Sequence, residues 1–172
     1  MLFKGDLFMP KTKLYPTLNN LPSNTKTVVI QLLNERLADG LDVALLTKQA
    51  HWNMKGPQFI GVHEMVDGFR GELDAFNDDM AERITALGGT AFGTSQDIAH
   101  TSKIAAYPTN IVKVEDHIEA LIERYGTFAN AVRKAIDEAD EAGDADTADL
   151  FTGISRALDK QLWFLEAHKP VK

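Results

Sequence analysis

The sequence predicts an all-α fold, a four-helix bundle in which one long connection joins the second and third helices. Four segments repeat apolar residues at the three- and four-residue spacing of an amphipathic helix. The first and third connections are short, whereas the second spans about residues 88–113. No apolar run reaches the length needed to cross a bilayer, so we expect a soluble protein without a membrane contact.

The first two helices are predicted from their apolar stripes and from the residues that end them. The first extends over about 24–53 and ends before Gly56-Pro57, since these residues interrupt helices. Its predicted core stripe is Ile30, Leu33, Leu37, Leu41 and Leu45. The second extends over about 58–87 and ends at Gly88-Gly89. Its predicted core stripe is Val62, Phe69, Leu73, Phe76, Met80, Ile84 and Leu87.

The last two helices form a second predicted pair. The third extends over about 114–139, and Gly143 ends it. Its predicted core stripe is Ile118, Leu121, Tyr125, Phe128, Val132 and Ile136. The fourth begins near Asp144, because aspartate is a good N-cap and further acidic residues suit the first turns. Its predicted core stripe is Phe151, Ile154, Leu158, Leu162 and Leu165.

The lengths of the three connections predict the topology. Each short connection makes an antiparallel hairpin, and the long one can travel the roughly 40 Å of a 28-residue helix. Short, long and short connections in this order are typical of the ferritin-like bundle. We expect an N-terminal extension over 1–22, partly flexible, the bundle over 23–168, and a short tail over 169–172. One short extra helix is consistent with residues 95–104.

Composition limits the chemistry. The chain of 172 residues has no cysteine, which excludes disulfides, thiolate metal sites and cysteine nucleophiles and fits a reducing, cytoplasmic location. The N-terminus lacks the apolar core and cleavage site of a signal peptide. The net charge of −7 is concentrated in the body of the chain, so this body should repel nucleic acid and attract cations.

Potential metal ligands of the second helix lie away from its core stripe. With Phe69 at zero on a helical wheel, His63 falls near 120°, Asp67 near 160°, Asp78 near 180° and Glu82 near 220°. No Glu-x-x-His motif occurs, so the sequence does not support a di-iron site inside the bundle. Any site built from these residues is therefore outside the bundle.

Axial spacing divides these ligands into two groups. His63/Asp67 and Asp78/Glu82 are each four residues apart, but the groups are separated by roughly 22 Å. A second copy packed antiparallel across a two-fold axis near residues 72–73 would bring the two groups together. His51, at the end of the first helix, can join His63 across the bend. Small residues at the crossing point allow close approach, namely Gly68, Gly71 and Ala75.

A plainer interpretation accounts for the same residues. Acidic faces of amphipathic helices are usually only solvated, and His51 beside Trp52 could be a packed histidine at a helix end. From spacing alone, the metal site and the solvated face are about equally supported. The remaining histidines have no companions at ligand spacing and are interpreted as structural or exposed, namely His100, His117 and His168.

One long stretch carries a specific resemblance. KQAHWNMKGPQFIGVHEMVDGFRGELDAFNDDMAERITALGGTAFGT resembles the signature of the Dps family, the DNA-binding proteins from starved cells or mini-ferritins. AAYPTNI, VEDHIEALIERY and DTADLFTGISRALDKQLWFLEAH resemble the later helices of that family. The resemblance covers roughly residues 26–168 without an insertion or deletion.

The resemblance implies a hollow dodecamer with a ferroxidase centre at each two-fold interface. The implied ligands of iron are His51, His63, Asp67, Asp78 and Glu82. The centre would oxidise Fe(II), preferably with hydrogen peroxide, and deposit ferric mineral in the cavity, which protects DNA. Other divalent metals such as Zn or Mn could occupy the same site. Lys48 would pair with a carboxylate near the ligands, Trp52 would lie beside them, and Glu64 and Asp67 would nucleate mineral.

Two further assignments have open alternatives. An acidic cluster is a candidate for the entry pores, and helix capping with a solvated loop explains it equally well; it comprises Asp140, Glu141, Asp144, Asp146 and Asp149. DNA contact would use Lys4, Lys11 and Lys13 in the N-terminal extension, although the acidic body opposes it. The alternative functions are a nucleoid-associated DNA-compacting protein with iron oxidation secondary, and a metal-free structural bundle.

Overall fold

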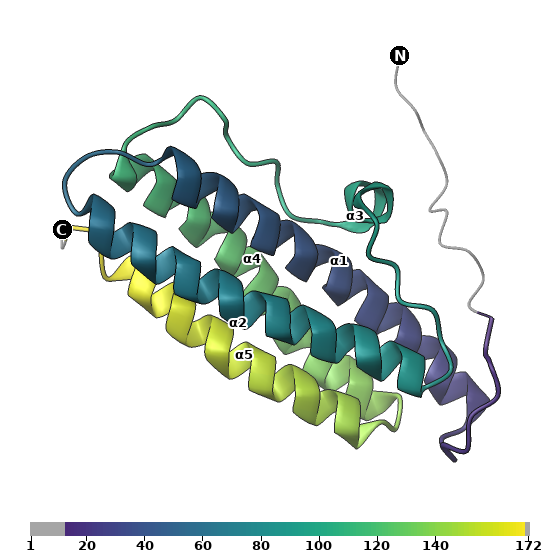
Figure 1. Ribbon diagram of the computed structural model, residues 1–172. Coiled ribbons are helices and arrows are strands. Elements are labelled where there is room, and N and C mark those ends of the chain that lie inside the picture. The colour runs from purple at the N-terminus through teal and green to yellow at the C-terminus, as the bar shows by residue number, and fades with distance from the viewer. Residues whose placement is uncertain (1–12, 171–172) are drawn as a thin grey trace.

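The computed structural model describes residues 13–170 of the chain, and regular secondary structure in this part is helical (Figure 1). The helices in chain order are α1 (Ser23–Asn53), α2 (Phe59–Ala86), α3 (Ser95–Thr101), α4 (Val114–Glu141) and α5 (Ala145–Glu166). Four of them are long and lie side by side as a bundle, whereas α3 is short and belongs to the connection between α2 and α4. The predicted all-α bundle with one long crossover is confirmed, and the short extra helix lies within the range where it was expected.

Two antiparallel hairpins form the bundle. A short bend joins α1 to α2, and residues 142–144 join α4 to α5. Helix α1 also packs against α4, and α2 packs against α5. None of the helices in the described part of the chain is long and apolar enough to cross a membrane.

Residue choice at the tight α4–α5 turn explains why α4 ends there. Gly143 has a φ of 86°, in the left-handed region that glycine enters without a Cβ penalty. Its N–H donates to the carbonyl of Asp140 at 2.9 Å, which closes the end of α4. Asp144 then caps α5 by accepting from the N–H of Thr147. The predicted N-cap at Asp144 is confirmed.

Side chains of the bundle hold the crossover in place. The carboxamide of Asn34 donates to the carbonyl of Thr90 at 3.1 Å and accepts from the N–H of Phe92 at 2.9 Å. The buried carboxylate of Asp39 accepts from the N–H of Lys103 at 2.8 Å. Further hydrogen bonds join Ser102 to Asp42, Arg124 to Ala105 and Ala106, and Lys55 to Val112 and Val114. These contacts tie the crossover to α1, to α4 and to the α1–α2 bend.

The core confirms most of the predicted stripes, but the stripe of α1 is wrong at its end. Leu41 is half-buried and Leu45 is 54% exposed. Each step of four residues turns the helix by about 40° beyond a full turn, so successive four-residue steps carry these leucines away from the core. Their places in the core are taken by Val43, Ala44, Leu46 and Ala50. Three other predicted core residues are half-buried instead of fully buried, namely Phe76 on α2, Ile136 on α4 and Leu162 on α5.

Part of the predicted N-terminal extension is attached to the bundle. The N–H of Tyr15 donates to the carbonyl of Gly88 at 2.8 Å, just beyond the end of α2. The Lys26 ammonium donates to the carbonyl of Asn19 at 2.5 Å. Residues 13–22 therefore follow the end of the bundle where α1 begins and α2 ends.

Candidate metal centre

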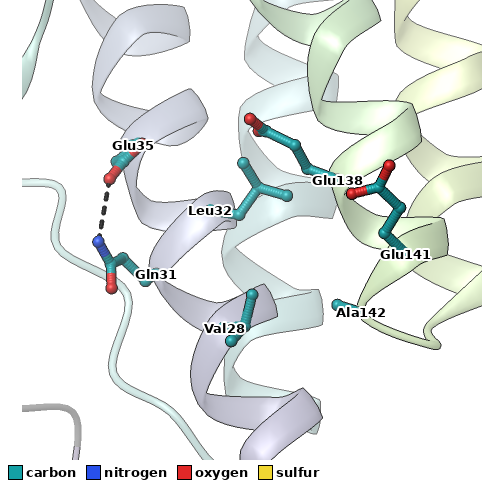
Figure 2. Close-up of a pocket in the computed structure, with 7 residues that line it drawn as sticks. All are labelled: Val28, Gln31, Leu32, Glu35, Glu138, Glu141 and Ala142. Carbon is teal, nitrogen blue, oxygen red and sulfur yellow. Dashed lines mark hydrogen bonds between the residues drawn. The ribbon is translucent and has the colours of Figure 1, made fainter.

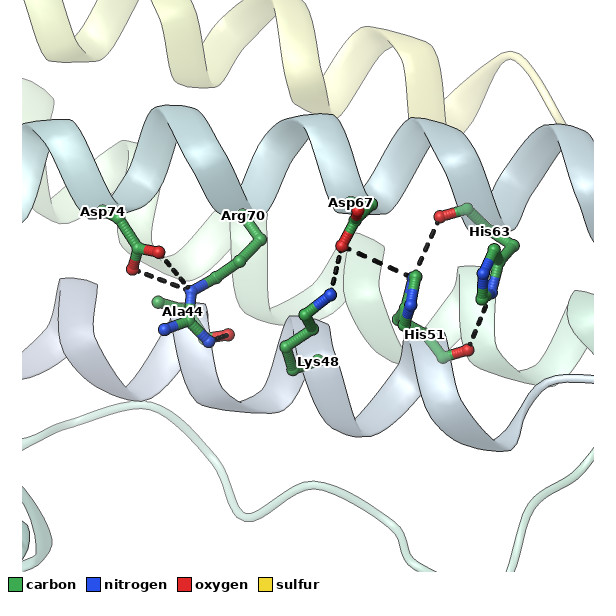
Figure 3. A network of polar contacts seen from close by, with 7 residues as sticks. All are labelled: Ala44, Lys48, His51, His63, Asp67, Arg70 and Asp74. Carbon is green, nitrogen blue, oxygen red and sulfur yellow. Dashed lines mark hydrogen bonds and ion pairs between the residues drawn. The ribbon is translucent and has the colours of Figure 1, made fainter.

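The α1–α2 bend brings His51 and His63 into direct contact, as the sequence predicts. Their rings are stacked, with centroids 3.6 Å apart and an interplanar angle of 20°. His51 Nδ1 lies 3.1 Å from the carbonyl oxygen of His63, and His63 Nδ1 lies 3.0 Å from the carbonyl oxygen of His51 (Figure 3). The two residues thus hold each other through reciprocal ring-to-backbone hydrogen bonds.

These reciprocal bonds determine which nitrogen can bind a metal. A carbonyl oxygen only accepts, so each Nδ1 must carry the hydrogen and donate it. In the neutral ring the lone pair is then on Nε2. A hydrogen bond from the second nitrogen to a backbone carbonyl is also how metal-binding histidines are usually oriented. The pair therefore presents two Nε2 donors of defined tautomer.

Asp67 lies one turn beyond His63 and adds a carboxylate. Its Oδ1 pairs with the Lys48 ammonium and lies 3.7 Å from Nδ1 of His51 (Figure 3). The hydrogen bond from Lys48 lowers the pKa of the Asp67 carboxyl below its ordinary value of 3.8, and the positive charge of Lys48 acts in the same direction. Asp67 is therefore anionic at neutral pH, and the expected pairing of Lys48 with a carboxylate is present.

The polar network continues along α2 beyond the residues that the sequence singled out. Arg70 Nε donates to both carboxylate oxygens of Asp74, at 2.7 and 2.9 Å, and its Nη1 donates to the carbonyl of Ala44 at 3.1 Å (Figure 3). The four-residue spacing of arginine and aspartate was a signal that could have identified this pair. Arg70 fastens α2 to α1 two turns from the histidines.

Asp78 and Glu82 are exposed on α2 and lie apart from the histidine pair. Fifteen residues separate Asp78 from His63, roughly 22 Å along the helix axis. Over residues 13–170 of a single chain, no three histidine or carboxylate side chains are close enough to enclose a metal ion. The structure thus pairs His51 with His63, places Asp67 beside His51 on its Nδ1 side, and leaves Asp78 and Glu82 separate.

A pocket of about 580 Å³ adjoins the two histidines. Its lining comprises His51, Trp52, Met54, Lys55, Gly56, Phe59 and His63. The Phe59 ring lies 4.9 Å from that of His63, a contact that the sequence did not identify. Trp52 is largely exposed, so core packing does not explain it. The histidine pair therefore lies beside an open, mainly aromatic wall.

The acidic cluster proposed for the pores divides into two kinds of residue. Asp144 is buried, and its carboxylate accepts from Arg83 and Thr147, so capping and ion pairing occupy it. The other four members are exposed. Glu141 also lines a groove between α1 and α4 (Figure 2). The groove is lined by Val28, Gln31, Leu32, Glu35, Glu138, Glu141 and Ala142.

The other predicted residues have ordinary environments. Glu64 is exposed on α2. His117 is buried with its Nδ1 2.8 Å from the Tyr107 hydroxyl, whereas His100 and His168 are exposed. Of the candidate DNA contacts, Lys4 and Lys11 lie outside the described residues. The Lys13 ammonium lies 5.2 Å from the centre of the Tyr15 ring.

Comparisons with known proteins agree with this architecture. Residues 30–169 match the model of the ferritin-like domain. The "DNA protection during starvation protein" of Agrobacterium fabrum is 62% identical over 156 residues, which is 91% of this chain and 96% of that relative. DpsA14 from Streptomyces coelicolor superposes with a TM-score of 0.87 at 34% identity, covering 92% of this chain and 94% of its own. Mycobacterium smegmatis Dps superposes with a TM-score of 0.86 at 32% identity, covering 90% of this chain and 94% of its own.

Proposed function

This chain belongs to the Dps family of ferritin-like proteins, and from that premise we propose that it oxidises and stores iron. Fe(II) is the substrate, hydrogen peroxide is the preferred oxidant, and the ferric product is kept as mineral in the cavity of a hollow dodecamer. Removing Fe(II) and peroxide together protects DNA in the bacterial cytoplasm from oxidative damage.

The geometry of His51 and His63 is the observation that carries this proposal. Both rings donate Nδ1–H to backbone carbonyls, so both offer Nε2 to a metal. Asp67, anionic beside them, adds an oxygen donor. Mixed nitrogen and oxygen donors without sulfur suit iron, and also Zn or Mn as competitors.

A second chain completes the site. Asp78 and Glu82 of one chain would meet His51, His63 and Asp67 of the other across a two-fold axis near residues 72–73. This arrangement uses both groups of ligands on α2, which one chain cannot bring together because they lie roughly 22 Å apart. The dimer is therefore the smallest active unit of the proposed ferroxidase.

The reaction needs electrons from two iron ions. Each Fe(II) gives one electron, the O–O bond of peroxide breaks, and two protons complete two water molecules while two Fe(III) are formed. The carboxylates of the site favour Fe(III), because the higher charge is attracted more strongly to anionic oxygens. Lys48, which holds Asp67, would orient that ligand, and Trp52 would flank it.

The residues around the cavity have subsidiary roles in this proposal. Glu64 and Asp67 would collect Fe(III) for nucleation. The exposed acidic residues Asp140, Glu141, Asp146 and Asp149 would attract Fe(II) to the pores, since clustered negative charge raises the local concentration of cations. Asp144 is not included, because its carboxylate is buried and paired.

Iron loading tests the proposal. Anaerobic Fe(II) followed by peroxide should produce ferric absorbance rapidly in the wild-type protein. We expect the His51→Ala/His63→Ala variant to lose at least 90% of the initial rate, with its native mass unchanged. His100→Ala/His168→Ala removes the same number of histidines from exposed positions and should react at the wild-type rate. Equal rates in all three proteins would refute the proposed ligands.

DNA compaction remains the alternative function, with Lys4, Lys11 and Lys13 as contacts. It is suggested by the "DNA protection" in the relative's name, although that protection also follows from removing iron and peroxide. The net charge of −7 opposes direct binding to a polyanion.

A further inference from the structure

An exposed apolar strip follows the outer side of α1. Leu45 is 54% exposed, Leu41 is half-buried, and Trp52 is exposed near the end of the helix. The four residues from Leu41 to Leu45 place both leucines on one face, and Trp52 follows seven residues later, about two turns. Large apolar side chains that share one face are typical of a surface that another protein covers.

A groove lies on the same side of the molecule, at the level where Leu41 emerges. It has a volume of about 320 Å³ and lies between α1, α2 and the first residues of the crossover. Its lining comprises Leu37, Leu41, Asp74, Asn77, Asp78, Ala81, Ala91 and Gly93. Leucine and alanine side chains thus form an apolar part beside the two aspartates, and Asp78 is a proposed iron ligand.

The adjoining face of α2 is open at its midpoint. A Cβ added at Gly68 or at Gly71 would have no neighbour within 4 Å. Small residues at these positions allow a second helix to approach closely. The proposed two-fold axis passes through this part of α2, so none of residues 13–170 obstructs the second copy at these two glycines.

Contacts within the chain fix the register of α1 against α2. His51 lies level with His63, Lys48 with Asp67, and Gly40 packs against Asn77. A two-fold axis perpendicular to α2 near residues 72–73 places α1 over its own copy, running in the opposite direction. The axis sets each part of α2 level with a part of the partner's α2, and the register relates α1 to α2 within each chain. Together, these two relations set Leu45 level with about residue 40 of the partner, beside the groove.

We infer that Leu45 of each chain seats in the groove of a second copy, against the partner's Leu37 and Leu41. The inference rests on the proposed function for the position of the two-fold axis. Symmetry makes the contact twice per dimer, once at each side of the axis. Each contact is adjacent to Asp78, so the leucine would exclude water from one side of the completed metal site.

Substitution of Leu45 tests the contact, with the native mass as the readout. Leu45→Glu places a charge in the apolar groove, and we expect the native mass to fall below that of the wild type, because the two-fold contact of the proposed dodecamer is lost. Val28→Glu is the matched control, because Val28 is equally exposed, at 52%, near the other end of α1. Val28→Glu should keep the wild-type mass.

A charge swap tests the register. Leu41→Lys alone should also dissociate the dimer, whereas Leu41→Lys/Leu45→Glu should restore it, since each glutamate then meets the partner's residue 41 as lysine. Leu45→Glu with the wild-type mass, or an equal fall in mass for Val28→Glu, would overturn the inference. A double variant that keeps the lowered mass would overturn the pairing with Leu41. The masses are measured without iron, so failure of ferroxidase activity is scored separately.

Discussion

Replacement of Arg83 by methionine should destabilise the α4–α5 hairpin strongly. Arg83 Nη2 donates to both carboxylate oxygens of Asp144, at 2.7 and 2.9 Å, and its Nε donates to the Thr147 hydroxyl at 3.0 Å. Asp144 is only 2% exposed, so its charge has little access to water once the guanidinium is removed. Methionine keeps most of the aliphatic stem and removes the charge.

The expected loss is about 3 kcal/mol. Breaking a buried ion pair costs roughly 3–5 kcal/mol because it leaves an uncompensated charge. Asp144 keeps two bonds, from the N–H and the hydroxyl of Thr147, so the lower end of that range applies. For a chain of this size, 3 kcal/mol corresponds to a fall of about 6–12 °C in Tm.

Urea unfolding followed by circular dichroism, at one protein concentration for all variants, measures this loss. Arg133→Met is the control, because the Arg133–Asp159 pair is exposed on both sides, at 56% and 48%, and exposed pairs contribute little. An Arg83→Met midpoint indistinguishable from that of Arg133→Met would refute the reasoning.

The same variant has a definite pH dependence. Burial raises the pKa of Asp144, but the hydrogen bonds from Thr147 and Arg83 outweigh it and bring the pKa below 3.8. A depressed pKa stabilises the fold above the unfolded value of 3.8, and this contribution disappears as the pH falls through the lower folded value. The unfolded chains of both proteins share the same Asp144 pKa, so the difference in stability between wild type and Arg83→Met should be full at neutral pH and shrink as the pH falls toward the lowered pKa of the folded wild type.

Three further predictions concern other parts of the chain. Gly40→Ala should lower the free energy of unfolding, measured in urea, by about 1 kcal/mol or more. Alanine has the better helix propensity, but its Cβ would overlap the Asn77 carboxamide. In an Asn77→Ala background, where that carboxamide is absent, the same substitution should lower the free energy of unfolding by less. Burial lowers the pKa of His117 below 6.5, so the unfolded chain binds more protons just below that pH; stability should fall as the pH drops from 6.5, and His117→Gln should remove this slope. In a low-salt mobility-shift assay we expect no retardation of DNA; a steeply salt-dependent shift that vanishes on deletion of residues 1–13 would contradict this.

Helix positions could be predicted because their ends are chemically marked. Gly56-Pro57, Gly88-Gly89 and Asp144 lie at or next to the observed helix ends. The path of the crossover was not predictable, since it depends on contacts such as Asn34 with Thr90 between residues far apart in the chain. The end of the α1 stripe was misassigned because an exposed leucine has the same hydrophobicity as one facing the core.

For the candidate site, the sequence predicted which residues would meet but not how. A short bend between two helices necessarily brings His51 near His63. Asp67 follows His63 by four residues and therefore lies one turn further along α2. The ring-to-carbonyl bonds depend on backbone positions across the bend, which no residue pattern encodes. The pairing of Asp144 with Arg83 was also missed, because 61 residues separate the two in the sequence.

The ring-to-carbonyl bonds make the two imidazoles independent in one respect. The acceptor for His63 is the main-chain oxygen of residue 51, which persists whatever side chain that residue carries, and the converse holds for His51. Replacing one histidine therefore leaves the other with its proton on the same nitrogen. Each imidazole can be removed singly, and a change in iron affinity at the proposed site would then measure the contribution of one imidazole instead of the collapse of both.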